Sequence, residues 1–138
     1  MTTFALVHGA WQSGSCWDLL VHELTKRGHP CVAPDLPYDD PTATWDAYAE
    51  VMTDALSGAV DADPGPYPLE APPRLRSVYI YTTEDEFFTP ESRRWAARNV
   101  FGIEPIEMEG GHFPMLERPA ELADVLVASL KDQPGAAA

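Results

Sequence analysis

The chain has 138 residues, 45% of them hydrophobic, which is enough apolar material for one hydrophobic core. Its formal net charge is -13 at pH 7, and its lysines and arginines form no cluster, which argues against binding to nucleic acid or to an anionic membrane surface. The opening residues lack the basic segment of a signal peptide, and no apolar run is long enough for a membrane span. We therefore expect a cytoplasmic protein.

The first half of the chain predicts two strands, each followed by a helix. Residues 3–8 and 30–34 are short apolar runs, typical of strands that are buried on both faces. Apolar residues recur at helical spacing after Ser15, which we expect to cap that helix. A second helix is predicted over residues 44–57. Its predicted inner face is Trp45, Tyr48, Ala49, Met52 and Leu56.

The second half predicts the same alternation. Residues 76–82 and 105–108 are expected to be the third and fourth strands. Thr89 is predicted to cap a third helix, with Pro90 at its first position, and Pro119 is expected to open the last helix. The side chains predicted to face the core from these two helices are Trp95, Ala96, Leu122, Val125, Leu126 and Leu130.

The alternation of strands and helices predicts an α/β fold with a parallel sheet covered on both faces. Residues 60–73 are rich in proline, which excludes an ordinary helix or interior strand, so we interpret them as a linker. We expect one domain over residues 1–131 and a disordered tail over residues 132–138.

A candidate catalytic residue, His112, follows two glycines at the end of the fourth predicted strand. Glycines permit backbone angles that other residues rarely adopt, so this turn can project the imidazole from the rim of the sheet. Histidine is also the side chain best suited to proton transfer near neutral pH. The alternative is a turn histidine without a chemical role. The two cysteines, Cys16 and Cys31, have no metal-ligand spacing, so we expect reduced thiols and neither a metal nor another cofactor.

Four segments together resemble the α/β-hydrolase family: residues 4–17, 28–37, 79–90 and 109–112. The branch they resemble most contains plant methyl-ester esterases and hydroxynitrile lyases. The resemblance implies a reduced three-layer sandwich with a four-stranded parallel sheet, in the strand order 2-1-3-4.

The resemblance also implies roles for individual residues. Asp85 corresponds to the acid that orients the histidine base His112, and the backbone N–H groups of Ala10 and Trp11 correspond to the oxyanion site. The alternatives are a solvated turn carboxylate for Asp85 and a plain strand-to-helix turn for Ala10 and Trp11. Three aromatic residues are expected to line a substrate pocket, or else to fill the core: Trp17, Phe87 and Phe113.

The chain departs from this family at the nucleophile, because it contains no Gly-x-Ser-x-Gly elbow. The family's cap region and two central strands are missing with it. Ser13 and Ser15 lie near the expected site and are possible substitute nucleophiles, although Ser15 is more simply a helix cap.

These observations leave three functional hypotheses. The first is an enzyme that uses a histidine–aspartate pair for hydrolytic or acid–base chemistry on a small, largely uncharged ester or carbonyl substrate. The second is a catalytically inactive protein that binds such a molecule. The third is a deletion fragment stabilised by strand-swapped oligomerisation. The expected partners are a small-molecule substrate and a second copy of the chain in a homodimer, with no nucleic acid and no membrane.

Overall fold

The computed structural model describes residues 1–57 and 77–131, in two compact units, Met1–Pro73 and Arg74–Ala138. The described part of each unit contains one two-stranded parallel sheet. Within the described ranges, no helix combines the length and hydrophobicity needed to cross a bilayer.

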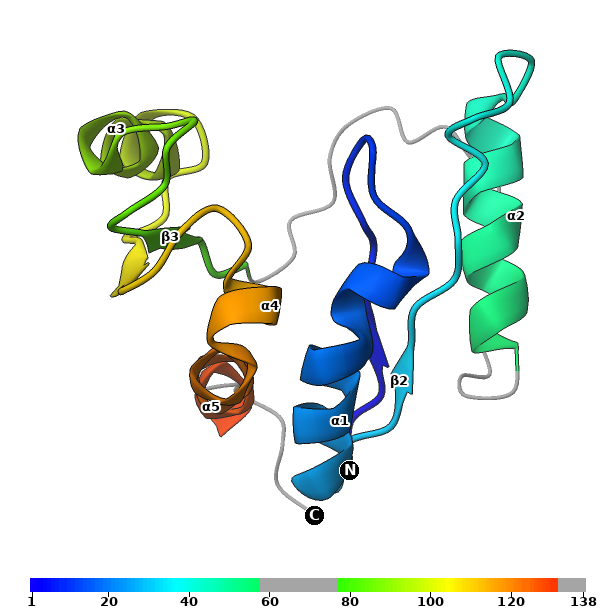
Figure 1. Ribbon diagram of the computed structural model, residues 1–138, viewed down its shortest axis with the longest axis horizontal. Helices are drawn as coiled ribbons and strands as arrows, with labels where there is room; N and C mark the ends of the chain where they lie inside the picture. The colour runs from blue at the N-terminus through cyan, green and yellow to red at the C-terminus, as the bar shows by residue number, and fades with distance from the viewer. Residues whose placement is uncertain (58–76, 132–138) are drawn as a thin grey trace. The chain divides into compact units, whose positions relative to one another are not determined.

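In the first unit, β1 (Phe4–Ala5) pairs in parallel with β2 (Cys31–Val32). The helices α1 (Asp18–Lys26) and α2 (Trp45–Leu56) lie on opposite sides of this strand pair (Figure 1). This arrangement follows from the sequence pattern, since strands with apolar residues on both faces need a helix on each side.

The chain enters α1 through a 3-10 turn, η1 (Gly14–Trp17), so the prediction that Ser15 caps the helix is wrong. The Ser15 hydroxyl instead lies 2.7 Å from that of Ser13. A contact distant in sequence explains the difference, because the N–H of Gly14 donates to Asp35 Oδ1 at 2.6 Å and fixes the turn before the helix begins.

The core of the first unit is made of leucines, and α2 contributes only half-buried side chains to it. Leu20 and Leu24 are completely buried, as expected for neighbours four residues apart on one helix face. The prediction that Trp45 faces the core is wrong, since 79% of its surface is exposed. The other two buried leucines of this unit are Leu6 and Leu36.

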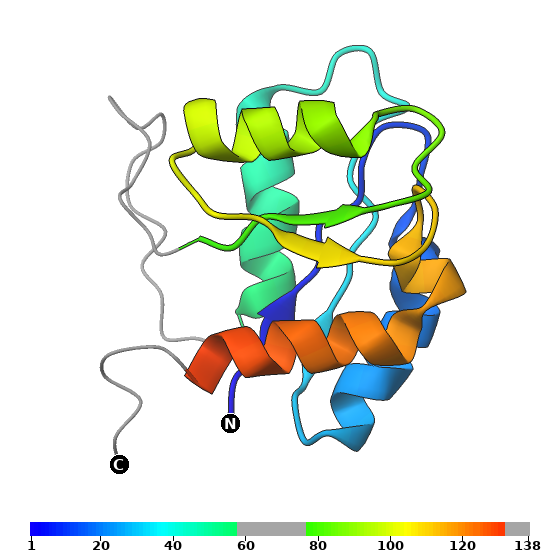
Figure 2. The same ribbon diagram turned by 90° about the vertical axis from the view of Figure 1, so that its left-hand side faces the viewer.

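In the second unit, β3 (Ile80–Thr82) pairs in parallel with β4 (Ile106–Met108). This pair lies between α3 (Pro90–Asn99) and α5 (Pro119–Lys131), as Figure 2 shows. A short helix that the sequence did not predict, α4 (Pro114–Glu117), connects β4 to α5.

The start of α3 confirms the predicted cap. The Thr89 hydroxyl accepts a hydrogen bond from the N–H of Ser92 at 3.2 Å, and Pro90 is the first helical residue. The helix turns a different face to the strands from the one predicted: Ala97 is completely buried, whereas Trp95 is 61% exposed. The small Ala97 side chain lets α3 approach β3 closely, which a tryptophan would prevent.

The two observed pairs, β1–β2 and β3–β4, agree with both ends of the predicted strand order. The central pairing of the first strand with the third is not among the pairs of the described residues, so the four-stranded sheet is not confirmed. The single domain over residues 1–131 also stays a prediction. The predicted linker at 60–73 and the tail at 132–138 lie outside the described residues.

Candidate active site

Asp85 lies in the turn between β3 and α3, where its own loop holds the carboxylate. Oδ1 accepts hydrogen bonds from the backbone N–H groups of Phe87, at 2.8 Å, and Phe88, at 3.1 Å. An aspartate that binds the N–H groups two and three residues ahead stabilises a tight turn, so the sequence fixes this carboxylate locally.

His112 lies in the turn that follows β4. Gly110 has a φ of +119°, a conformation that L side chains rarely adopt. The next N–H, that of Gly111, donates to Glu117 Oε2 at 2.7 Å, and this bond ties the turn to α4. The N–H of Glu84 donates to the Gly110 carbonyl at 2.8 Å, which joins the histidine turn to the acid turn.

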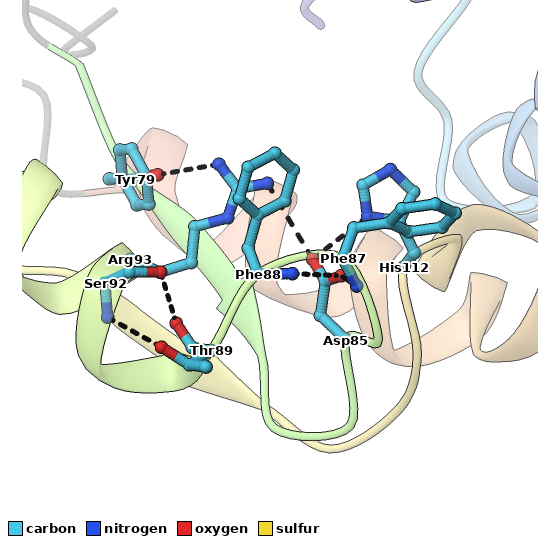
Figure 3. Close-up of polar contacts among 8 residues, drawn as sticks. All are labelled: Tyr79, Asp85, Phe87, Phe88, Thr89, Ser92, Arg93 and His112. Carbon is cyan, nitrogen blue, oxygen red and sulfur yellow. Dashed lines mark hydrogen bonds and ion pairs between the residues drawn. The ribbon is translucent and has the colours of Figure 1, made fainter.

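These two turns bring the predicted acid and base into contact (Figure 3). His112 Nδ1 lies 3.0 Å from Asp85 Oδ2, where the side chains are 31% and 6% exposed respectively. An ionised carboxylate only accepts, so Nδ1–H is the donor, and Nε2 of the neutral ring then carries the free lone pair. The arrangement can therefore take up a proton at Nε2.

The surroundings of Asp85 keep it ionised. Burial alone would raise the pKa of the carboxyl group. The hydrogen bonds from His112 and from the N–H groups of Phe87 and Phe88 outweigh burial and hold the pKa of Asp85 below its ordinary value. The carboxylate is thus negatively charged at neutral pH and holds the histidine in one tautomer.

Aromatic rings surround the imidazole. The ring centroids of Phe87 and Phe113 lie 4.6 Å and 4.7 Å from that of His112. Phe87 is 70% exposed, so its ring is partly available to a ligand. Both residues were predicted to line the pocket, and the structure places them against the candidate base.

Sequence reasoning missed two residues of this site, Arg93 and Glu117. Arg93 Nη2 lies 3.7 Å from Asp85 Oδ2. The sequence shows two adjacent arginines in α3, Arg93 and Arg94, but it does not tell which of them faces Asp85. Glu117 required the unpredicted helix α4.

The remaining candidates belong to the first unit. Ala10 and Trp11 lie in the turn after β1, where Trp11 has a φ of +62° and is 92% exposed. The indole Nε1 of Trp17 is buried and has no hydrogen-bond partner among the described residues. The roles of these residues, and of Ser13 and Ser15, stay predictions.

A cavity of about 340 Å³ lies between β4 and α5, apart from the predicted pocket residues. Acidic side chains dominate its lining, which consists of Glu107, Met108, Glu109, Glu121, Asp124 and Val125. Over residues 1–57 and 77–131, no three His, Cys, Asp or Glu side chains are grouped closely enough to hold a metal ion.

The chain matches the model of one protein family and resembles two crystal structures. Residues 4–69 and 38–125 match the model of the alpha/beta hydrolase family. Two crystal structures, one of the pyrethroid hydrolase PytH with BIF and one of a PytH variant, align with TM-scores of 0.72 and 0.71. In each alignment the identity is 16%, with 99% of this chain and 99% of the other covered, a level of identity that shows the fold alone. No curated protein matches the sequence.

Proposed function

Because the chain belongs to the α/β-hydrolase family, whose model matches residues 4–69 and 38–125, we propose that it hydrolyses small, largely uncharged esters or related carbonyl compounds with His112 as base. The observation that carries this proposal is the 3.0 Å contact between His112 Nδ1 and the buried carboxylate of Asp85. The acid orients the ring and stabilises the imidazolium that forms, while Nε2 takes the proton.

The surroundings of the base support this substrate class. The rings of Phe87 and Phe113 pack against the imidazole, so an apolar group attached to the reacting carbonyl would find contacts there. The net charge of -13 disfavours anionic substrates. The structural relatives described as a pyrethroid hydrolase support hydrolysis, and the resemblance to methyl-ester esterases supports an ester.

The missing nucleophile elbow determines the expected mechanism. Without that serine, the base would act on water, or directly on a substrate proton, and no acyl-enzyme would accumulate. Cys16 is a poor replacement, because burial and the nearby Asp18 raise the pKa of its thiol and keep it protonated. We propose the N–H groups of Ala10 and Trp11 as oxyanion donors, which would stabilise the negative charge that develops on the carbonyl oxygen of the substrate.

The test is hydrolysis of an activated aryl ester of a short carboxylic acid by the whole chain. We expect slow steady-state turnover without a burst, since a triad that lacks its nucleophile keeps only about 10³- to 10⁴-fold acceleration over water. His112→Ala should lower the rate by roughly 10²-fold or more, and Asp85→Asn should also lower it strongly. His22→Ala is the matched control, because His22 is an exposed histidine on α1, and this variant should keep the wild-type rate.

Two outcomes would replace the proposal. A stoichiometric burst that disappears in Ser13→Ala or in Ser15→Ala, but persists in the other, would identify a relocated nucleophile. If no ester turns over and His112→Ala changes nothing, the chain is instead a binding protein. The absence of a Gly-x-Ser-x-Gly sequence favours that second candidate.

A further inference from the structure

Arg93 is held against the catalytic acid by three contacts (Figure 3). Nη2 lies 3.7 Å from Asp85 Oδ2, and Nη1 donates to the Tyr79 hydroxyl at 3.4 Å. The guanidinium carbon lies 3.7 Å from the centroid of the Phe88 ring, within the range of a cation–π interaction. With 28% of the side chain exposed, Arg93 is more restrained than an ordinary surface arginine.

The position of Arg93 matters because it shares one oxygen with the base. Asp85 Oδ1 is occupied by two backbone N–H groups, so Oδ2 is left for side chains, and both His112 and Arg93 approach it. A cation beside Oδ2 draws part of the carboxylate's charge away from the imidazole and disfavours an imidazolium nearby.

We propose that Arg93 is a positioning residue that weakens the affinity of the Asp85–His112 pair for a proton. Phe88 and Tyr79 hold the guanidinium at the distance from Asp85 that this role requires. The inference rests on the proposed role of His112, but it concerns an equilibrium that exists without substrate.

Other charged groups around the pair do not duplicate this role. Glu84 and Glu86 flank Asp85 in its turn and are exposed. Both are carboxylates, so neither supplies a cation to Asp85. From the elements packed on the histidine turn, the charged groups are Glu109, which pairs with Arg118 at 3.0 Å, and Glu117, which accepts the Gly111 N–H at 2.7 Å. Among the described residues, Arg93 is therefore the cation that the structure places on the carboxylate itself.

The test is an NMR titration of the His112 ring in the whole chain, with its signals assigned by their loss in His112→Ala. We expect Arg93→Gln to move the titration midpoint of this ring to higher pH by roughly half a pH unit, the size of a partly exposed ion pair. Arg93→Met should do the same, and it keeps an apolar stem over Phe88 if glutamine disturbs the helix. Arg93→Lys, which keeps the charge, should restore part of the wild-type behaviour.

The control is Arg98→Gln, which removes the same charge from the same helix. Arg98 pairs with Glu104 and makes none of the contacts with Asp85. If Arg93→Gln and Arg98→Gln shift the titration midpoint of His112 equally, the effect comes from overall charge and the inference fails. The inference also fails if Arg93→Gln and Arg93→Met both leave the midpoint unchanged or move it to lower pH. The titration needs no turnover, so an inactive protein that shows the expected shift contradicts only the proposed function, and an active protein without it contradicts only the role of Arg93.

Discussion

Replacing Gly14 with alanine puts a methyl group where the backbone of another segment already lies. A Cβ at this position would meet the carbonyl oxygen of Ala33 at 2.1 Å and the carbonyl carbon of Pro34 at 3.2 Å. Since both obstacles are main-chain atoms, no rotation of a side chain can relieve the contact. Either η1 or the segment after β2 must move.

The cost of this movement has two parts. Overpacking of a close contact costs about 1 to 3 kcal/mol. Displacement of η1 also breaks the 2.6 Å hydrogen bond from the Gly14 N–H to Asp35, and a hydrogen bond to a charged group contributes about 1.5 to 3 kcal/mol. We therefore expect Gly14→Ala to lower the free energy of unfolding by about 2.5 to 6 kcal/mol, a large share of the stability of a small domain.

Urea unfolding, followed by far-UV circular dichroism and by tryptophan fluorescence, measures this loss. Gly9→Ala is the control, since the nearest atom to its Cβ would be Gln12 Oε1 at 3.8 Å, an ordinary contact. Its midpoint should lie near that of the wild type, because alanine fits there without strain. Equal free energies of unfolding for Gly14→Ala and the wild type would show that the close approach of η1 to the segment after β2 is not part of the folded protein.

Three further predictions concern α3, the acid and assembly. Thr89→Ala should cost about 1 kcal/mol, measured by urea unfolding, because it removes the acceptor of the Ser92 N–H at 3.2 Å; no loss of stability would contradict the cap. The pKa of Asp85 is lower in the folded chain than its ordinary value, so Asp85 contributes stability that is complete above the unfolded pKa and is lost as pH falls through the lower folded pKa. Asp85→Asn should therefore flatten the fall in thermal stability below about pH 4, whereas an unchanged acid limb would argue against the contacts of the carboxylate. Finally, exposed apolar side chains, which include Trp95 at 61% and Phe101 at 59%, lead us to expect a homodimer; light scattering that gives a monomer at every concentration would refute it.

Features encoded by neighbouring residues could be predicted from the sequence. Thr89 and Pro90 mark the start of α3 because a cap and its acceptor lie within three residues. The same holds for Asp85, whose turn is stabilised by the N–H groups that follow it. Because both turns come directly after parallel strands, they meet at one edge of the β3–β4 pair, and the contact between Asp85 and His112 could be anticipated.

Features that depend on distant contacts could not be predicted. Ser15 has the local pattern of a helix cap, but the bond from Gly14 to Asp35, 21 residues away, selects a 3-10 turn instead. Helical spacing predicts which residues share one face of a helix, but it does not predict which face packs on a strand. For this reason Trp95 was expected in the core, although it is exposed. Arg93 and Arg94 could not be distinguished for the same reason, since only the rotation of α3 decides which of them reaches Asp85.

The contacts that hold Asp85 have an evolutionary consequence. Within residues 1–57 and 77–131, the atoms that fix this carboxylate come from its own turn, from His112 and from Arg93, which all lie in the second unit. None of these bonds uses a residue from before Ser77. Insertions, deletions or exchanges of sequence in the first half of a gene for such a chain would thus leave these contacts between Asp85 and His112 in place, as a part that can be inherited separately.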